Sequence, residues 1–430
     1  MEKGGEELMA WLLFGILIVL FFINVPIAVA LGLASMIVLM VQDNVPLMVV
    51  VQKMFTSTDS FTLMAVPFFI LAGKLMEVGG ISKRLVDFAM TIVGRMHGGL
   101  AMVSVVTCMF FAAISGSGAA TTAAVGAIMI PAMVQKGYDK SFSTAIQAAG
   151  GTIGVMIPPS VPMILFGVIA GASISDLFIA GILPGIFVGI SLILVAYFIS
   201  RKRGYGKEEK SSGKEIFTSF NRAILAILMP VIILGGIYGG VFTPTEASVV
   251  AVVYGLIVGL FIYKEIKWKD LPEVFIQSAV TSAVIMFIIS CASIFGFILT
   301  REQIPLSITN ALLAISDNPI IVLIIINVIL LIVGTFLETS AAIIIMAPIL
   351  LPVTTAVGID PVHFGIIMVV NLAIGFITPP VGINLFVASN IANLRLEKIV
   401  RAIIPFLIIL IIDIIIISFV PELSLFFLDK

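Results

Sequence analysis

The sequence predicts an all-α polytopic membrane protein made of two inverted-topology repeats, each with about five transmembrane helices and one re-entrant helical hairpin. Three observations predict this fold class: an apolar composition, apolar segments of membrane-spanning length, and similar segments in the two halves of the chain. The 430 residues are 60% hydrophobic and only 11% charged, with a mean hydropathy of +1.25. A soluble domain carries roughly 25% charged residues, so a lipid bilayer is the expected environment. The net charge of −1 indicates no nucleic-acid partner.

The apolar segments define the expected elements in order, because a transmembrane helix needs about 20 apolar residues. The expected spans are 9–25, 27–49, 61–78, 142–172, 181–200, 222–241, 246–263, 279–299, 362–392 and 402–420. The stretches 98–135 and 319–353 are nearly twice too long for one helix, and polar turn residues interrupt each. Irregular backbone at membrane depth is tolerated only where it lines a buried or water-filled site, so we predict re-entrant hairpins there. Segments 81–96 and 304–315 are predicted to be amphipathic helices at the membrane interface.

Similar segments recur in the same order in both halves of the chain. The pairs are 24–33 with 242–251, 72–82 with 295–305, Pro131 with Pro348, and 150–160 with 371–381. Their offsets of 218, 223, 217 and 221 residues are nearly constant, which indicates a duplication. The predicted first repeat is 1–200, with a hairpin at 98–135 and a broken helix at 142–172. A charged cytoplasmic linker, 201–221, precedes the second repeat, 222–430, with a hairpin at 319–353 and a broken helix at 362–392.

The distribution of lysine and arginine indicates that the repeats are inverted, because cytoplasmic loops carry an excess of basic residues. Segment 74–95 has four basic residues, whereas its counterpart, 296–318, has only Arg301. Segment 264–269 has three lysines, whereas its counterpart, 42–60, has only Lys53. The excess alternates between equivalent loops, which places the halves upside down relative to each other. With a cytoplasmic linker, both termini are then expected outside the cytoplasm.

The first hairpin has a turn-forming, hydroxyl-rich centre, Ser115-Gly116-Ser117-Gly118. A half-helix that ends there leaves carbonyl groups without partners, and the half-helix that follows leaves N–H groups without partners. Free carbonyl groups suit a hard cation such as Na⁺, and free N–H groups at a helix N-terminus suit a carboxylate. The sequence therefore predicts a solute site at this tip, where hydroxyl groups such as those of Ser117 and Thr121 are available.

Two proline pairs break two of the expected spans near their middle: Pro158-Pro159 and Pro379-Pro380. Each proline lacks the backbone N–H group that a preceding carbonyl would accept in a helix. One hairpin tip and one broken helix could then complete an oxygen cage for Na⁺. The second tip, 334–340, would face the second broken helix, so we expect two pseudo-symmetric cation sites with the substrate between the tips. Inverted repeats with interrupted helices are typical of secondary transporters.

Other interpretations of these polar residues remain open. Glycine and proline kinks occur in ordinary membrane helices, where serine and threonine usually bond to their own helix or to a neighbour. Glu338, an ionisable residue in an apolar hairpin, either tunes the cation site or caps a helix. Glu246 follows Thr243-Pro244-Thr245, a pattern that predicts helix capping. Asp413, in the last span, favours a contact with another membrane subunit over a role in transport.

Five motifs together resemble the large membrane subunit of tripartite ATP-independent periplasmic (TRAP) transporters. They are SGSGAAT (115–121), GTIGVMIPPS (151–160), GGVFTPTEAS (239–248), GTFLETSAAIIIMAPILLPV (334–353) and GFITPPVGINLFV (375–387). The motifs stand in order and cover nearly the whole chain. The resemblance implies a Na⁺-coupled uptake system in a bacterial or archaeal inner membrane. It also implies an elevator-type mechanism on an architecture like that of the ion transporter superfamily.

The resemblance also implies ligands. One Na⁺ site would use Ser115, Gly118, Gly154, Ile157 and Pro159, mostly through backbone oxygens. The other would use Gly334, Gly375, Thr378 and Val381. Candidate substrate ligands are Ser117, Thr121, Thr335, Thr339 and Asn384. Gly118 stands where many members have serine, which removes one hydroxyl group from the first site.

The partners that the resemblance implies are a periplasmic substrate-binding protein and a small four-helix membrane subunit. The binding protein would deliver an organic anion, such as a C4-dicarboxylate or sialic acid. The small subunit is expected on a separate chain, because 430 residues leave no room for it. Two or more Na⁺ ions and no organic cofactor are expected.

Three rival functions are weighed against this one. A stand-alone Na⁺/dicarboxylate carrier would share the architecture but need no binding protein. A passive channel would not depend on a Na⁺ gradient. An intramembrane serine protease using Ser115 or Ser117 would need a His or Lys base at membrane depth, but His97 is expected in a loop near Arg95, and His363 is at the start of a span in the opposite repeat. Cys108 and Cys291 are also far apart, so neither a disulfide nor a metal site is expected, and the chain is not expected to be an enzyme.

Overall fold

The computed structural model describes residues 2–42, 45–206 and 212–428, which fold into helices joined by short connections. Among these residues, eight helices are long and apolar enough to cross a membrane, or nine if α3 (Leu47–Thr58) and the bent continuation that includes α4 (Ala65–Val78) count as one span. The chain is thus an all-helical, multi-span membrane protein. Three of the eight, Gly118–Gln135, Pro319–Phe336 and Thr339–Ala356, belong to the expected hairpins, whereas several of the ten expected spans consist of apolar helices of only 10–17 residues.

The first half of the chain runs from α1 to α10. Besides α3 and α4, it contains α1 (Glu2–Phe22), α2 (Ile27–Gln42), η1 (Thr62–Met64), α5 (Ile81–Val93), α6 (Gly99–Ser115), α7 (Gly118–Gln135), α8 (Lys140–Thr152), η2 (Ile153–Val155), α9 (Val161–Ala170) and α10 (Ile174–Lys202). The expected span 27–49 is wrong at its end, because α2 ends at Gln42 and a new helix follows Pro46. A bend of 62° separates α3 from η1 and α4.

The second half runs from α11 to α20. It contains α11 (Gly213–Tyr238), α12 (Pro244–Ile257), the π-helical η3 (Val258–Ile262), η4 (Trp268–Asp270), α13 (Leu271–Arg301), α14 (Ile304–Ile315), α15 (Pro319–Phe336), α16 (Thr339–Ala356), α17 (Pro361–Gly375), α18 (Ile383–Ala392), α19 (Leu396–Phe419) and α20 (Glu422–Leu425). Helix α11 begins before the expected start at 222, because Ser212 and Glu215 form a capping box. The expected linker 201–221 is therefore mostly helical at its ends, and its residues 207–211 lie outside the described residues.

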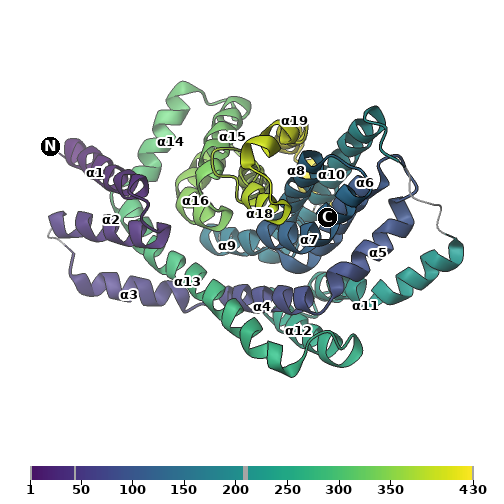
Figure 1. Ribbon diagram of the computed structural model, residues 1–430. Helices are drawn as coiled ribbons and strands as arrows, with labels where there is room; N and C mark the ends of the chain where they lie inside the picture. The colour runs from purple at the N-terminus through teal and green to yellow at the C-terminus, as the bar shows by residue number, and fades with distance from the viewer. Residues whose placement is uncertain (1, 43–44, 207–211, 429–430) are drawn as a thin grey trace.

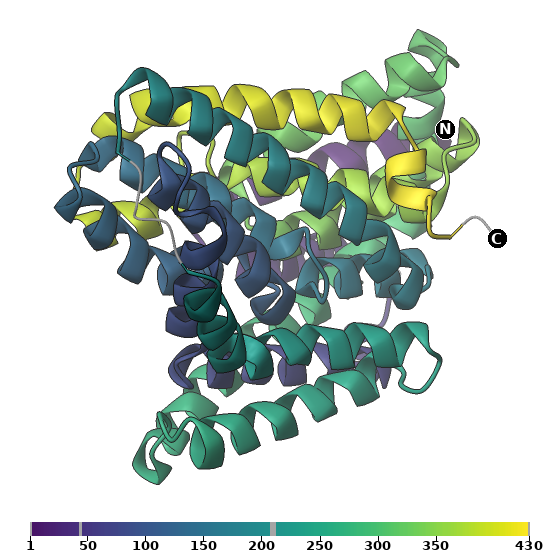
Figure 2. The same ribbon diagram turned by 90° about the vertical axis from the view of Figure 1, so that its right-hand side faces the viewer.

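Two groups of helices can be distinguished, and they touch each other where α4 meets α6 and α13 meets α16. Figure 1 shows α6–α10, α15, α16, α18 and α19 above an arc formed by α3, α4, α11, α12 and α13. In Figure 2 the teal and green helices α11–α13 lie at the bottom of the molecule. We call α6–α10 with α15–α19 the core unit, and α1–α4 with α11–α13 the frame. Within the frame, α4 packs on α12 and α13, and α2 and α3 pack on α13. Helix α5 contacts α6 and α11, and α14 contacts α13 and α16, so these two amphipathic helices connect the frame to the core unit in addition to the direct contacts of α4 with α6 and of α13 with α16.

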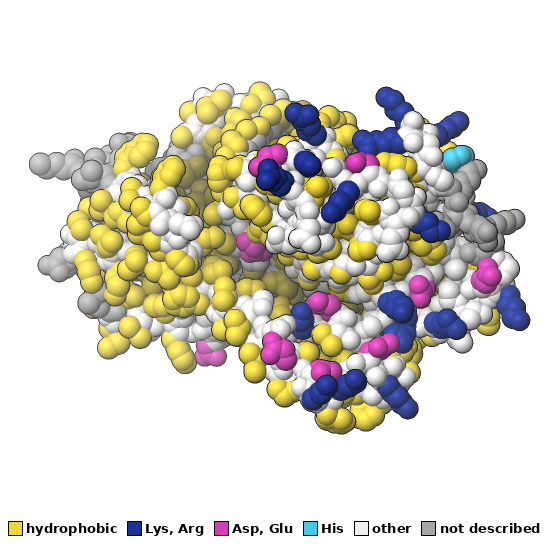
Figure 3. Space-filling view, in the orientation of Figure 1, with side chains coloured by type: hydrophobic (Ala, Val, Ile, Leu, Met, Phe, Trp, Pro, Cys, Tyr) yellow, Lys and Arg dark blue, Asp and Glu magenta, His cyan; other side chains and the backbone are white. Residues whose placement is uncertain are grey.

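The two broken helices are the innermost part of the molecule. Residues 142–167 and 363–377 are buried throughout. Large apolar side chains are instead exposed on outer helices, among them Trp11, Met48 and Phe55. Figure 3 shows hydrophobic side chains covering the left part of the molecule over α1–α3, while lysine and arginine gather on the right. Apolar surface of this kind suits contact with lipid or with another membrane segment.

The second hairpin arms and the second halves of the broken helices have matching lengths in the two halves of the chain. Helices α7 and α16 both have 18 residues, and α9 and α18 both have 10. Pro131 is the fourteenth residue of α7, and the fourteenth residue of α16 is Pro352. The expected pairing of Pro131 with Pro348 is therefore wrong. Pro131 corresponds to Pro352 at an offset of 221, which is also the offset between the two proline pairs.

Candidate functional site

The first hairpin opens at its tip between two half-helices, as the sequence predicts. Helix α6 ends at Ser115, and Gly116 turns the chain with a φ of 60°, a conformation that favours glycine. Ser117 then caps α7, with its Oγ accepting a hydrogen bond from the Ala120 N–H group at 3.4 Å. The Ser115 and Thr121 hydroxyl oxygens lie 2.8 Å apart, and Thr121 Oγ1 donates to the Ser117 carbonyl at 2.8 Å. The tip is therefore a compact group of hydroxyl and carbonyl oxygens.

The first broken helix packs its backbone directly against this tip. A Cβ atom on Gly154 would lie 2.5 Å from the Ser117 carbonyl oxygen, and a Cβ atom on Gly116 would lie 2.7 Å from that of Pro159. The Gly154 carbonyl cannot accept from residue 158, because Pro158 has no N–H group. Of the five predicted ligands of the first Na⁺ site, Ser115, Gly118, Gly154 and Pro159 are thus at the tip or against it. The side chain of the fifth, Ile157, packs against Gly185 of α10.

The second tip and the second break repeat this arrangement with different chemistry. A Cβ atom on Gly375 would overlap the backbone of Gly334, so α15 and α17 touch at these two glycines. Thr378 lies in the break, and its hydroxyl group donates to the Ile374 carbonyl at 2.9 Å. Val381 also lies in the break and is half-buried, whereas residues 151–160 of the first break are all buried. The second predicted site is therefore the more exposed of the two.

The first tip also meets the second broken helix. A Cβ atom on Gly118 would lie 2.9 Å from the Phe376 ring and 3.1 Å from the Gly151 carbonyl oxygen, so a larger residue here would require the ring to shift. Thr122 of α7 and Asn384 of α18 both lie against Gly151, and Asn384 Nδ2 donates to the Ala148 carbonyl at 3.3 Å. Helix α18 packs on α7 and α8, and α9 packs on α16 and α17, so each break is held by the opposite half.

The structure separates the predicted substrate ligands. Ser117 and Thr121 lie together at the first tip, and Asn384 approaches the same region beside Thr122. Thr339 is fully buried at the start of α16, and its hydroxyl oxygen has no hydrogen-bond partner, as is also true of Asn384 Oδ1. Thr335 is not part of this group, because its hydroxyl group donates to the Ile332 carbonyl of its own helix at 2.7 Å.

Sequence reasoning missed two polar pairs that bind hairpins to broken helices. Ser104 Oγ donates to Gln147 Oε1 at 2.5 Å between α6 and α8. Asn371 Nδ2 donates to Asn327 Oδ1 at 2.6 Å between α17 and α15. An amide side chain in an apolar helix was the available signal, because such a group needs a partner inside the membrane. In each half of the chain, the pair joins the first arm of the hairpin to the first segment of the broken helix.

The three carboxylates singled out in the sequence have structural partners. Glu246 caps α12 in a capping box with Thr243, which confirms that prediction. Glu338 caps α16 and accepts from the Ser340 N–H group at 2.8 Å. The expected contact of Asp413 with another subunit is wrong: its side chain is 1% exposed and accepts from Ser191 Oγ at 2.5 Å. Asp413 therefore joins α19 to α10 inside the core unit.

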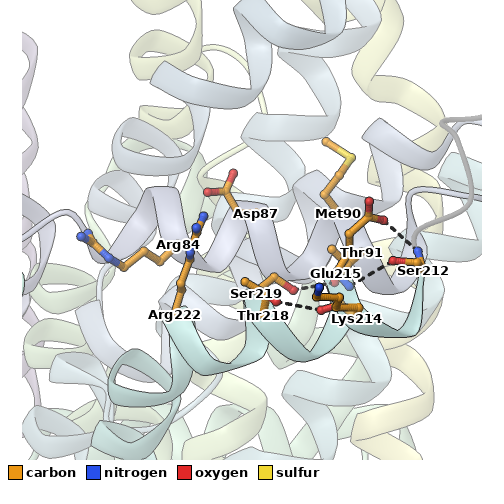
Figure 4. Close-up of a pocket in the computed structure, with 10 residues that line it drawn as sticks. All are labelled: Arg84, Asp87, Met90, Thr91, Ser212, Lys214, Glu215, Thr218, Ser219 and Arg222. Atoms are coloured by element: carbon orange, nitrogen blue, oxygen red, sulfur yellow. Dashed lines mark hydrogen bonds between the residues drawn. The ribbon is translucent and has the colours of Figure 1, made fainter.

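Two surface pockets lie away from the tips. One, of about 440 Å³, lies between α5 and α11, where Thr91 and Ser219 are joined by a hydrogen bond of 3.0 Å (Figure 4). Arg84, Asp87, Lys214 and Arg222 also line it. The other, of about 390 Å³, lies between η1 and the turn from α9 to α10. Neither contains a predicted cation or substrate ligand, so the candidate site remains the region of the tips and breaks.

Known proteins resemble this chain along most of its length. Residues 14–423 match the family model described as tripartite ATP-independent periplasmic transporter, DctM component. The chain is 49% identical to the isethionate TRAP transporter permease protein DctMQ of Oleidesulfovibrio alaskensis, over 96% of this chain and 66% of that protein. It is 45% identical to the C4-dicarboxylate TRAP transporter large permease protein DctM of Pseudomonas aeruginosa, over 87% of each. It is 38% identical to the sialic acid TRAP transporter large permease protein SiaM of Vibrio cholerae, over 94% and 95%.

Solved transporters share the fold at low sequence identity. The YdaH transporter of Alcanivorax borkumensis aligns with a TM-score of 0.63 and 14% identity over 86% of each chain. MtrF of Neisseria gonorrhoeae aligns with a TM-score of 0.61 and 12% identity over 96% of each chain. At such low identity these two structures support the fold alone. The family model matches nearly all of the sequence and therefore supports family membership. The chain belongs to the DctM component family of tripartite ATP-independent periplasmic transporters, and it is a transporter permease and not an enzyme.

Proposed function

We propose that the chain couples the entry of Na⁺ to the import of an organic anion. The observation that carries this proposal is the contact of each hairpin arm or tip with a helix break, at Ser117 with Gly154 and at Gly334 with Gly375. Carbonyl groups at such breaks lack helical donors, and unwound carbonyls are the ligands that transporters use for Na⁺. Ser115, Gly118, Gly154, Ile157 and Pro159 would hold one ion. Gly334, Gly375, Thr378 and Val381 would hold the other.

The substrate is proposed to bind between the tips. The α7 N-terminus offers N–H groups to an anion, and Ser117, Thr121 and Asn384 offer polar side chains close to it. The relatives are named for isethionate, C4-dicarboxylates and sialic acid, which are all organic anions. An organic anion is therefore the substrate class that we propose for this chain.

The proposed mechanism is an elevator, in which the core unit moves against the frame. Equal lengths of α7 and α16, and of α9 and α18, support two repeats, and the alternating basic residues of their loops support inversion. The reciprocal packing of α18 on α7 and of α9 on α16 supports the same relation. The polar pairs Ser104–Gln147 and Asn327–Asn371 would hold hairpins and broken helices together as they move. The membrane would be the cytoplasmic membrane, with both termini in the periplasm.

Two partners are proposed: a periplasmic binding protein that delivers the anion and a small four-helix membrane subunit. Membership of a tripartite family supports both. The name DctMQ of the longer isethionate relative supports the second, because this chain spans only 66% of that protein.

The test is uptake by proteoliposomes that contain the chain and the small subunit, with and without the binding protein. We expect accumulation of a labelled organic anion only with an inward Na⁺ gradient and the loaded binding protein. Equal uptake of a dicarboxylate without the binding protein would instead identify a stand-alone carrier. Equilibration that ignores the Na⁺ gradient would identify a channel and would contradict the proposal.

A further inference from the structure

The frame touches the first hairpin tip at Gly73 of α4. A Cβ atom on Gly73 would lie 3.3 Å from the Ser115 Cα atom and 3.4 Å from the Ser115 carbonyl oxygen. Ser115 is the last residue of α6 and a proposed ligand of the first Na⁺ site, and it is only 8% exposed. Because Gly73 has no side chain, the backbone of the frame lies directly against the backbone of the tip.

The second half of the chain has a glycine at the equivalent position, Gly296 of α13. Two residues with left-handed backbone establish the equivalence: Gly80, with a φ of 73°, precedes α5, and Gln303, with a φ of 49°, precedes α14. Gly73 and Gly296 each stand seven residues before these positions. The two glycines therefore occupy the same place in the two repeats.

The surroundings of the two glycines are nevertheless opposite. Around a Cβ atom added to Gly296, no described atom outside the adjoining backbone of α13 lies within 4 Å. The counterpart of Ser115 is Phe336, because each is the last residue of the first arm of its hairpin. Phe336 is 59% exposed. In the second half, both the glycine and the end of the arm thus lack the contact that their counterparts make in the first half.

The packing of whole helices shows the same asymmetry. Helices α4 and α5 pack mainly on α6, the first arm of the first hairpin, whereas α13 and α14 pack on α16, the second arm of the second hairpin. In a transporter built from two inverted copies, the opposite end of the movement exchanges the two arrangements. We therefore expect a state in which the end of α15 lies against α13 and the end of α6 has left α4.

We propose that Gly73 and Gly296 are alternate docking points for the two hairpin tips, an inference that rests on the proposed elevator function. In the present structure the first tip lies on Gly73 and the second tip is undocked. After the core unit has moved, the second tip lies on Gly296 through Phe336, and the contact at Gly73 is open. Because the core unit moves as one body, one contact forms only when the other is broken, and each contact stabilises one end of the movement.

Gly296→Leu tests the contact that the present structure does not contain. The added side chain extends from a position that is open here, so the variant should fold and keep the wild-type shift of the thermal unfolding midpoint with Na⁺. It would overlap the docked second tip, so Na⁺-driven uptake by proteoliposomes should fall at least about tenfold. The labelled anions are isethionate, succinate and sialic acid, supplied with the small subunit and the binding protein.

Gly235→Leu in α11 is the matched control for this variant. A Cβ atom on Gly235 also has no atom within 4 Å, and α11 packs on α5 and α12. The same substitution in another helix of the frame should therefore leave both uptake and the Na⁺ response at the wild-type level.

A cysteine pair, Gly296→Cys with Phe336→Cys, provides a second measurement that needs no bulky side chain. Docking with the spacing of Gly73 and Ser115 would bring the two Cβ atoms within reach of a disulfide. We expect the disulfide to form in proteoliposomes during uptake and to stop it, and we expect reduction to restore uptake. Gly235→Cys with Phe336→Cys should not react.

The outcomes separate this inference from the function on which it rests. Uptake by Gly296→Leu at the wild-type rate would overturn the proposal, as would a 296–336 cysteine pair that stays reduced while uptake continues. Loss of the Na⁺ response in Gly296→Leu would also overturn it, because the substitution would then act on the cation sites. Wild type that accumulates none of the three anions with a Na⁺ gradient would refute the proposed function itself.

Discussion

At the scale of single residues, the site depends on glycines that let two backbones touch. Gly334 and Gly375 bring α15 against α17, and Gly154 brings the first break against the Ser117 carbonyl. A side chain at any of these positions would separate carbonyl oxygens that have to converge on one ion. Replacement of a glycine is therefore a direct test of the candidate cation sites.

Gly375→Ala is expected to remove Na⁺-dependent stabilisation and to lower stability by about 1–3 kcal/mol, because the added Cβ overlaps the Gly334 backbone. Thermal unfolding with and without Na⁺ measures both effects. Gly296→Ala in α13 is the control, because no atom lies within 4 Å of its added Cβ. A Gly375→Ala protein with a wild-type response to Na⁺ would show that this contact does not form a cation site.

Ser191→Ala tests the internal role of Asp413. It leaves the buried carboxyl group without its hydrogen-bond donor, so we expect a loss of about 1–3 kcal/mol in the free energy of unfolding. Ser278→Ala is the control, because the Ser278 hydroxyl group is buried but bonds only within α13. Equal unfolding midpoints for the two variants would contradict a stabilising link between α10 and α19.

At the scale of elements, the chemistry of the site comes from two helices that stop and restart. Helix α17 ends at Gly375 and α18 begins at Ile383, and residues 156–160 separate η2 from α9. Proline at 158 keeps the Gly154 carbonyl free of a helical donor, whereas Val155 accepts from Ser160 Oγ at 2.7 Å. The break is thus arranged so that one carbonyl group is satisfied locally and another is left for a ligand.

Pro158→Ala is expected to raise the Na⁺ concentration for half-maximal stabilisation about tenfold, a change of about 1.4 kcal/mol. The new N–H group of residue 158 can bond to the Gly154 carbonyl and so compete with the ion. Pro131→Ala serves as the comparison, because Pro131 lies inside α7 and away from the tip. An unchanged Na⁺ titration for Pro158→Ala would exclude the Gly154 carbonyl as a ligand.

At the scale of the whole molecule, α5 and α14 each contact both the frame and the core unit, and they occupy equivalent positions in the two halves. If the halves are inverted, the turn after α5 and the turn after α14 lie on opposite sides of the membrane. The four basic residues of 74–95 and the single Arg301 of 296–318 favour that arrangement. The side of the membrane on which each turn lies can be measured directly.

We expect a cysteine at His97 to react with a membrane-impermeant maleimide only in inside-out vesicles, and a cysteine at Asp317 only in intact cells. His97 lies in the turn between α5 and α6, and Asp317 in the exposed turn between α14 and α15. The native Cys108 and Cys291 are buried, so wild type provides the background. Labelling of both positions from the same side would indicate parallel halves.

The sequence by itself determined the main breaks and caps, because these depend on neighbours along the chain, but it misplaced the end of α2 and the start of α11. Serine and glycine at 115–118, the proline pairs and the Thr243–Glu246 capping box act through local backbone chemistry, and the structure confirms each break or cap. The approximate limits of both hairpins follow from the same signals. Helix α3 was not predicted, because most of its residues lay between two expected spans, 27–49 and 61–78.

Only the tertiary structure decided which of these elements meet. Contacts such as Gly118 with Phe376, Thr122 with Gly151, and Ser191 with Asp413 join residues far apart in sequence, and no local pattern encodes them. The sequence alone left open whether Glu338 tunes a cation site or caps a helix. In the structure its side chain caps α16. Burial forces polar groups in an apolar interior to find partners, but the packing of whole helices determines which partners are within reach.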